Sequence, residues 1–233
     1  MSNDLEQLAN WYTSGQLDFD KLLVGFRYRS IKPYFKGKKA LEMGPADGVM
    51  TNLLVDDFDS LDLVDGAASL LALIQTYPNV RKFHALFEEF EPDCVYDTII
   101  MEHVLEHIEH PTDVLRRVQK WLAPEGMLIM GVPNAKSFHR LAAVKMGLLK
   151  SEYELNERDI ALGHFRVYDP DKLRADIEKA GLRVCAEGGV YFKPLSNKQI
   201  QESWTFDMLE GFYQLGKDFS KNAAEVFIVA GAT

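Results

Sequence analysis

Short apolar segments alternate with helical patterns along most of this chain, and this alternation limits its fold more than any other feature. The apolar segments that favour strands span residues 39–43, 60–65, 80–84, 96–101 and 127–132. The helical patterns between them span residues 49–55, 67–77 and 111–122. Strands that alternate with helices in this way are typical of an α/β domain built on a largely parallel sheet.

The pattern changes after residue 134, where helical additions to the sheet are expected. The expected elements are a helix over 169–180, a strand over 182–186, a helical block over 197–217 and a last strand over 224–229. One or two further helices are expected before the first strand, over residues 5–35. We therefore expect one domain over 1–233, made of an N-terminal helical cap (1–37), a sheet core (38–134) and two additions (135–165 and 191–221).

The chain is acidic, which disfavours two classes of partner. Its 233 residues include 26 Lys and Arg against 35 Asp and Glu, a formal net charge of −9. Nucleic acids and anionic membranes attract clustered basic residues, and the sequence has no basic run. No apolar run reaches the roughly 18 residues that span a bilayer, and the first residues lack the pattern of a signal peptide. We expect a cytoplasmic protein with Cys94 and Cys185 as reduced core thiols, and its oligomeric state is left open.

A glycine-rich turn follows the first expected strand, in residues 41–48 (LEMGPADG). Such a turn between a strand and a helix suits a nucleotide-like ligand, because the backbone approaches closely and the helix N-terminus is electropositive. The spacing of Gly44 and Gly48 differs from the dinucleotide fingerprint G-x-G-x-x-G, and the loop contains no Lys or Arg. The acids Glu42 and Asp47 instead favour a ligand that carries positive charge.

The second expected strand ends at an acid, Asp65. A carboxylate at that place accepts hydrogen bonds from both hydroxyls of a ribose, and its charge disfavours a 2′-phosphate. The glycine turn and this acid together select a nucleoside, and the acidic surroundings select a cationic one. S-adenosylmethionine (SAM), which carries a sulfonium and an ammonium, fits both conditions.

Four segments in succession resemble the motifs of the class I SAM-dependent methyltransferases. They are Glu42-x-Gly44-x-Ala46-x-Gly48, Asp65, residues 96–107 (YDTIIMEHVLEH) and residues 121–129 (WLAPEGMLI). The resemblance covers about residues 38–134. It implies a Rossmann-like, mostly parallel seven-stranded sheet with helices on both faces, an antiparallel last strand and helical additions over the cofactor site.

The same resemblance implies which residues hold SAM. These cofactor-binding residues are Tyr12, Glu42, Gly44, Gly48, Asp65, Leu86, Phe87 and Glu102. Asp65 would hold the ribose, Leu86 and Phe87 would offer backbone amides and an apolar wall, and Tyr12 would close over the cofactor. The family often places an acid after the third strand, and in residues 84–88 (HALFE) that acid is absent or displaced.

Polar residues gather at the carboxyl end of the fourth expected strand, where ligands and chemistry collect in open α/β sheets. They are Glu102, His103, Glu106, His107 and His110. If this segment is helical, its three histidines share one face. Methyl transfer from a sulfonium needs no acid, only an aligned nucleophile and, for a hydroxyl acceptor, a base. His103 and His107 are the candidate catalytic residues, because histidine titrates in the useful range.

Two other interpretations of this cluster stay open. Residues 103–107 (HVLEH) resemble the E-x-x-E-H of ubiquinone-pathway O-methyltransferases and small-RNA 3′-end methyltransferases, which points to a divalent metal with His164 as a further ligand. The replacement of the first Glu by His103 lowers the anionic charge, so a metal is not favoured and no metal ligand is assigned. In the other interpretation, Glu106 and His107 only fix the loop.

The additions outside the sheet are expected to bind the acceptor. A basic stretch in the first addition would bind an anionic acceptor or form a solvated helix face: His139, Arg140, Lys145, Lys150, Arg158, His164 and Arg166. Aromatic residues of the second addition would line the acceptor pocket or fill the core of the added helix: Tyr191, Phe192, Trp204, Phe206, Phe212 and Tyr213. Residues 163–168 (GHFRVY) also resemble small-molecule methyltransferases of polysaccharide and natural-product pathways.

These observations predict a SAM-dependent enzyme that methylates an oxygen of a small molecule, a sugar or related metabolite. Methylation of a small-molecule amine is the alternative, and it needs less of His103. A protein that binds SAM without turnover is a second alternative, because the binding motifs say nothing about chemistry. An NAD-dependent enzyme is disfavoured, since its fingerprint is missing.

Overall fold

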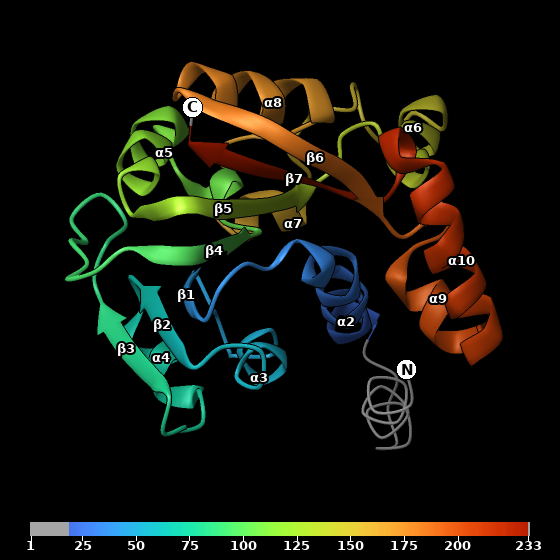
Figure 1. Cartoon of the computed structure of the whole chain (residues 1–233). Helices are drawn as coiled ribbons and strands as arrows, with labels where there is room; N and C mark the ends of the chain where they lie inside the picture. Colours follow the sequence, from blue (N-terminus) through green and yellow to red (C-terminus); the bar gives the residue numbers. More distant parts are fainter. Residues whose placement is uncertain (1–18, 233) are drawn as a thin grey trace.

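The computed structural model describes residues 19–232 and shows one seven-stranded sheet (Figure 1). Its strands are β1 (Lys39–Met43), β2 (Ser60–Asp65), β3 (Val80–His84), β4 (Tyr96–Glu102), β5 (Leu122–Pro133), β6 (Leu182–Val190) and β7 (Glu225–Ala232). The strand order is β3-β2-β1-β4-β5-β7-β6, and only β7 runs antiparallel to its neighbours. The expected Rossmann-like fold with an antiparallel last strand is therefore confirmed.

Helices cover both faces of the sheet, and each face has its own apolar core. One face packs against α2 (Phe19–Ile31), α3 (Thr51–Leu54), α4 (Ala68–Leu73), α9 (Asn197–Ser203) and α10 (Phe206–Asp218). The other face packs against α5 (Pro111–Gln119) and α8 (Pro170–Lys179). Two further helices lie in the long connection after β5, α6 (Phe138–Lys145) and α7 (Glu157–Ala161), and three short 3₁₀ helices are η1 (Lys32–Tyr34), η2 (Leu105–His107) and η3 (Ser220–Asn222).

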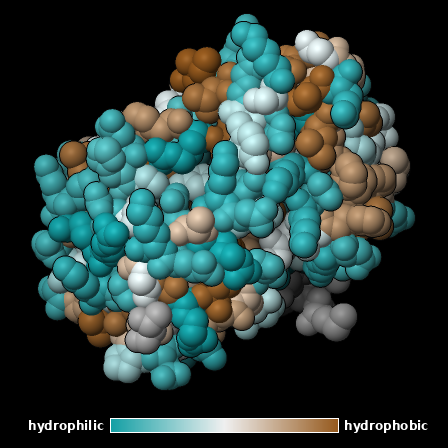
Figure 2. Space-filling view, turned by 90° about the horizontal axis from the view of Figure 1, so that it is seen from above, coloured by the Kyte–Doolittle hydropathy of each residue, from teal (hydrophilic) through white to brown (hydrophobic). Residues whose placement is uncertain are grey.

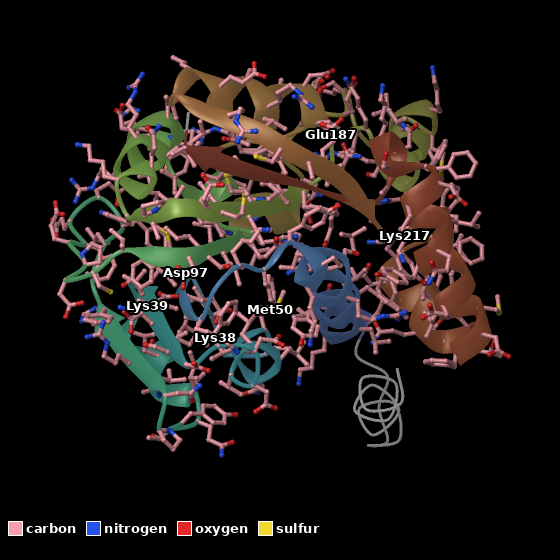
Figure 3. All side chains as sticks on the ribbon, viewed as in Figure 1. Lys38, Lys39, Met50, Asp97, Glu187 and Lys217 are labelled. Carbon is pink, nitrogen blue, oxygen red and sulfur yellow. The ribbon has the colours of Figure 1, made fainter. Side chains whose placement is uncertain are left out.

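The central strands are apolar on both sides because they are covered on both sides. In β4 every residue except Asp97 is buried, as expected for a strand between two helical layers. Asp97 instead ties the strands together at their amino ends, where its carboxylate accepts the backbone N–H groups of Lys38 and Lys39 at 2.9 and 3.0 Å (Figure 3). This contact joins the start of β1 to β4.

The fold brings five strand ends to one edge of the sheet. β1 to β5 are parallel, so their last residues lie at the same edge. The strand order reverses between β1 and β4, which makes a crevice at that edge the expected ligand site of an open α/β sheet. β7 runs the other way, so its first residue, Glu225, also lies at this edge opposite Pro133.

Three expected elements differ from the structure. The helix expected over 67–77 ends at Leu73, where Ile74 takes extended backbone (φ −70°, ψ 130°). The segment after β4 forms only the three-residue η2, so its histidines do not share a helix face. β5 begins at Leu122 instead of residue 127. Its register shifts against β4, and Glu125 is left-handed (φ 64°). The turn at residues 124–126 is thus an irregularity within one strand.

The described surface carries few features of its own. No helix among residues 19–232 is both long and apolar enough to cross a membrane. The face in Figure 2 is mostly hydrophilic, with hydrophobic groups scattered over it.

Both cysteines are free, but Cys185 is exposed and Cys94 is half-buried, so the expectation of two core thiols is wrong.

Two glycines of α10 differ sharply in their surroundings. A Cβ at Gly216 would lie 2.4 Å from the backbone nitrogen of Tyr191, whereas a Cβ at Gly211 would meet nothing within 4 Å. We expect Gly216→Ala to lower the free energy of unfolding by about 1–3 kcal/mol, because the helix must move off the strand end. Gly211→Ala is the matched control and is expected to raise it by about 0.5–1 kcal/mol. Denaturant unfolding measures both, and equal effects would contradict the close packing of α10.

Candidate active site

The glycine turn after β1 takes the conformation that its residues permit. Gly44 and Gly48 have positive φ (68° and 82°), a region that glycine enters without strain. Ala46 between them also has positive φ (49°), which is unfavourable for a residue with a Cβ. The N–H of Gly44 donates to the carbonyl of Val64 at 2.9 Å, which fixes the turn against β2. A Cβ at Gly44 would lie 2.8 Å from Val104, so the turn approaches the segment after β4 closely.

A cavity of ≈ 530 Å³, here called the cofactor cavity, opens beside this turn at the carboxyl edge of the sheet. Its size suits a nucleoside-sized ligand. The residues that line it come from the ends of β1 to β4 and from the α7 connection: Gly44, Ala46, Asp65, Gly66, Leu70, Leu86, Phe87, Glu88, His103, Val104, His107, Ile108 and Leu162. Four of the expected cofactor residues, Gly44, Asp65, Leu86 and Phe87, are thus brought together.

Two acidic side chains, Asp65 and Glu88, line the cofactor cavity. One oxygen of Asp65 accepts the backbone N–H of Ala67 at 2.7 Å. Among the described residues the other oxygen accepts no bond that competes for a ribose hydroxyl. Glu88 also lines the cavity, so an acid does follow β3, displaced along the chain from its usual place. The apolar Leu86 and Phe87 beside it suit the flat face of a purine.

The other expected cofactor residues do not line this cavity. Gly48 faces Ile74, where a Cβ would lie only 2.9 Å away. Glu42 is buried beneath the turn and accepts the hydroxyl of Thr51 at 2.6 Å; burial raises its pKa to about 7, against the effect of that bond. Glu102 lies behind the cavity, in the charged cluster described next. Tyr12 lies outside the described residues.

A buried charged cluster lies behind the cofactor cavity, and its centre is an ion pair that links α2 to β7. Arg27 donates to both carboxylate oxygens of Glu225, at 2.8 and 2.9 Å. Burial opposes ionisation of Glu225, but Arg27 and then His103 outweigh it and hold the pKa of this carboxyl below its ordinary range. Glu102 lies 3.5 Å from Arg27, and burial raises its pKa to about 8 despite that contact.

His103 stands at the front of this cluster. It directly follows β4 in a left-handed conformation (φ 57°), and its backbone N–H donates to the carbonyl of Gly131 in β5 at 2.8 Å. Its Nε2 is buried 3.2 Å from Glu225, and its Nδ1 lies 3.8 Å from Glu106. The ring therefore faces acids on two sides, without a hydrogen bond to Nε2 from the described residues, and 29% of its side chain is exposed.

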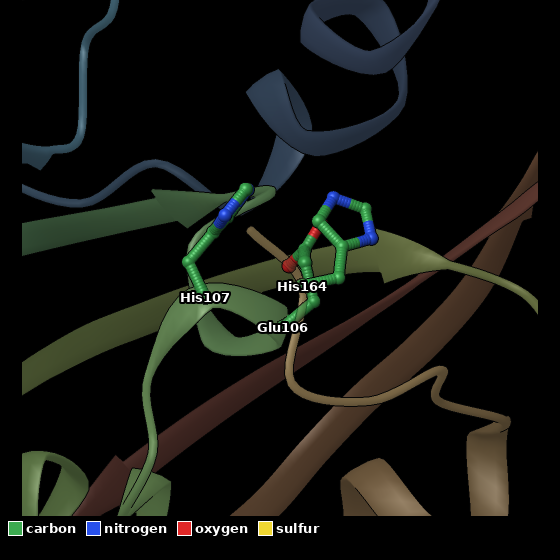
Figure 4. Close-up of side chains that lie close together, drawn as sticks. All are labelled: Glu106, His107 and His164. Atoms are coloured by element: carbon green, nitrogen blue, oxygen red, sulfur yellow. The ribbon is translucent and has the colours of Figure 1, made fainter. Parts of the chain in front are cut away.

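Glu106, His107 and His164 form a second group beside His103 (Figure 4). One ligand atom from each lies within 4.8 Å of the others, and the rings of His107 and His164 meet edge to face at 4.6 Å. Burial raises the pKa of Glu106 and lowers that of His164. The backbone joins these segments too, since the N–H of Phe165 donates to the carbonyl of Glu106 at 2.8 Å.

A second cavity, here called the acceptor pocket, lies on the other side of His103 and has a volume of ≈ 380 Å³. The residues that line it come from α2, the connection after β5, the segment after β6 and the start of β7: Asp20, Leu23, Val24, Arg27, His103, His107, Pro133, His139, Arg140, Asn156, Arg158, Asp159, Leu162, His164, Lys193, Asn197, Ala224 and Glu225. His103, His107 and Leu162 line both cavities. The pocket therefore adjoins the place where a cofactor would sit.

Two arginines of the basic stretch after β5 donate hydrogen bonds to backbone carbonyls of the protein itself. The guanidinium of Arg140 donates to the carbonyls of Glu152 and Glu154 and lies 3.3 Å from Asp159. Arg166 donates to three carbonyls after β4, among them Glu109 at 2.7 Å. These cations are engaged within the protein, which weakens the expectation that the whole stretch binds an anion.

Sequence reasoning missed Arg27, Glu225 and Lys193. Arg27 lies in α2, with no motif around it. Glu225 had a usable signal, because an acid that begins an antiparallel last strand must lie beside the ends of the parallel ones. The aromatic residues of the second addition do not line the acceptor pocket. Tyr191 and Tyr213 are buried and stack on Phe26 of α2.

Comparison with known proteins agrees with this geometry. A family profile described as "Methyltransferase domain" matches residues 25–187. A protein of Caulobacter sp. (strain K31) named ubiquinone biosynthesis O-methyltransferase is 30% identical over 172 residues, which cover 70% of this chain and 67% of that one. The mitochondrial protein of that name from Schizosaccharomyces pombe is 22% identical over 210 residues, 86% of this chain and 72% of its own.

A solved structure shows the same fold. The N-methyltransferase NodS of Bradyrhizobium japonicum, in complex with S-adenosyl-L-homocysteine (SAH), superposes with a TM-score of 0.57 at 13% identity and covers 98% of each chain. The profile spans the sheet from α2 into β6, and the cavity that it encloses suits a nucleoside with positive charge. This chain therefore belongs to the class I SAM-dependent methyltransferases, and SAM is its cofactor.

Proposed function

We propose that this methyltransferase transfers a methyl group to an oxygen of a small molecule, a sugar or related metabolite that bears a hydroxyl. The observation that carries the proposal is the place of His103, which lines both the cofactor cavity and the acceptor pocket. An imidazole between the two can take the proton of a hydroxyl as its oxygen attacks. The relatives named O-methyltransferase support oxygen as the acceptor atom.

SAM supplies a methyl group on a cationic sulfur that leaves as a neutral thioether. In this proposal Asp65 accepts the ribose hydroxyls, while Leu86 and Phe87 hold the adenine face and Glu88 accepts its amine. The turn after β1, with Glu42 buried beneath it, lies near the methionine portion. These residues bind and orient, and they leave proton transfer to the cluster behind them.

The proton of the acceptor hydroxyl goes to His103. Glu225 lies against Nε2, which favours the tautomer with its proton on Nε2 and leaves Nδ1 as the nitrogen that accepts. As the oxygen–carbon bond forms, the oxygen–hydrogen bond breaks and the proton moves to Nδ1. The resulting imidazolium lies between Glu225 and Glu106, whose carboxyl groups stabilise its charge.

Removing the charge of Asp65 tests the cofactor site. We expect Asp65→Asn to weaken SAH binding about tenfold to a hundredfold, because hydrogen bonds to a charged acceptor contribute about 1.5–3 kcal/mol. Isothermal titration calorimetry measures the effect. Asp59→Asn, an exposed position just before β2, is the matched control and should bind SAH normally. Equal affinity of the two variants would remove Asp65 from the site.

Removing the imidazole of His103 tests the base. We expect His103→Ala to lower kcat at least about a hundredfold, the usual contribution of a positioned base, while the affinity for SAH stays near normal. Methyl transfer to an accepted hydroxyl compound measures turnover. His110→Ala is the control, since His110 is exposed and lines neither cavity. Near-normal turnover of His103→Ala would contradict its role as the base and would leave activation of the hydroxyl to another group.

A divalent metal on Glu106, His107 and His164 is the second candidate for how the acceptor is activated. Both carboxylate oxygens of Glu106 are buried with no hydrogen-bond partner in the described part of the chain, which favours a cation there. One carboxylate and two imidazoles leave coordination positions open and suit zinc better than magnesium. A metal so held would lower the pKa of a bound hydroxyl.

Chelation separates the two candidates. We expect turnover to persist after exhaustive chelation and desalting, because a histidine base needs no metal. Loss of turnover that returns on addition of zinc would instead assign the activation to the metal. In that case Glu106→Gln would lose bound zinc in equilibrium dialysis, while His110→Ala would retain it.

A further inference from the structure

We propose that the acceptor carries a carboxylate as well as the methylated hydroxyl, and that Lys193 binds this carboxylate. The proposal rests on the proposed function, because it names the substrate class of the same pocket. Lys193 lies in the segment between β6 and α9 and lines the acceptor pocket. It does not line the cofactor cavity.

The other cations of the acceptor pocket already have acidic partners. Arg27 pairs with Glu225 at 2.8 Å. Arg158 lies 3.2 Å from Asp20, and Arg140 is held by Asp159 and by backbone carbonyls.

Lys193 differs from these three. Within residues 19–232 its ammonium forms no ion pair, and its nearest aromatic partner is the ring of Phe19, 6.0 Å from Nζ. The carboxylates of Glu225 and Asp20 interact with this ammonium only through longer-range electrostatics. Lys193 is therefore the lining cation that remains available to a ligand.

The charges of the pocket favour a monoanion. Of the described residues, four cationic and three acidic side chains line it, so the unpaired charge is that of one ammonium. His139 adds no charge, because burial lowers its pKa to about 3. A carboxylate balances the single charge, whereas a phosphate dianion would leave excess negative charge beside Asp20 and Glu225.

The burial of Lys193 indicates a site made for pairing. The side chain is half-buried, and desolvation lowers the pKa of its ammonium. A buried cation without a partner is costly, and a bound carboxylate would restore both its charge and its hydrogen bonds. Lys193 lines the acceptor pocket alone, whereas His103 lines both cavities, so an acceptor that binds Lys193 lies in the pocket that adjoins the cofactor cavity.

The experiment compares acids with their neutral amides on the SAH-saturated protein. The probes are glucuronate against glucuronamide, and meta-hydroxybenzoate against meta-hydroxybenzamide, with glucose phosphate as the dianion. Calorimetry first measures SAH binding, which tests the proposed function by itself, and then measures each probe. We expect the wild-type protein to bind at least one acid about tenfold or more tightly than its amide, and more tightly than the phosphate.

Three variants of the chain sharpen the result. Lys193→Met removes the charge and should abolish the preference for the acid with the amide and SAH affinities unchanged. Lys193→Arg keeps the charge and should retain the preference, and it serves if the methionine variant unfolds. Lys198→Met is the matched control, because Lys198 is exposed on α9 and pairs with Glu202; it should behave as wild type.

Each remaining outcome would overturn the proposal. SAH binding without any preference for an acid, including no binding of either acid, removes the carboxylate while the methyltransferase assignment stands. A preference that survives in Lys193→Met places the anion elsewhere. Weaker SAH binding in Lys193→Met assigns this lysine to the carboxylate of the cofactor. Tighter binding of the phosphate replaces the monoanion by a phosphorylated acceptor.

Discussion

The buried ion pair of Arg27 and Glu225 determines how the catalytic edge is built. It joins the first described helix, α2, to the start of the last strand. Burying two charges is costly, so the pair persists only through its two-point geometry, and loss of either partner would leave an uncompensated charge worth about 3–5 kcal/mol. Because Glu225 also faces His103, the same contact that positions α2 positions the imidazole.

The cluster around this pair contains more acid than base. Glu102, Glu106 and Glu225 lie within one buried region, against Arg27 and His103. The guanidinium of Arg27 pairs with Glu225, and burial raises the pKa of Glu102 and Glu106. A region with this balance accommodates an added positive charge more easily than an added negative one. This is the electrostatic condition under which an imidazolium is stable after a proton leaves the acceptor.

Signals that are local in the sequence predicted much of this molecule. The strands, the glycine turn, Asp65 and the place of His103 follow from apolar runs and from the ends of parallel strands, and the structure agrees with those positions. The role of Glu102 behind the cavity and the contacts of Arg27 could not be predicted, since they depend on how α2 packs against β7. A helical 103–110 segment was not found, because the N–H of His103 bonds to β5 and turns the chain.

The acidic character of the chain has a different meaning at each of its cavities. No Lys or Arg of residues 19–232 lines the cofactor cavity beside Asp65 and Glu88, so their negative charge is available to a cationic ligand. In the acceptor pocket Glu225, Asp159 and Asp20 pair with arginines, so their negative charge is neutralised locally. A protein of net charge −9 thereby presents one pocket to a cation and, across His103, a second pocket whose single free charge is positive. Two ligands of opposite charge would each be repelled from the other's cavity, so the order of charges along this edge selects which reactant lies on which side of the base.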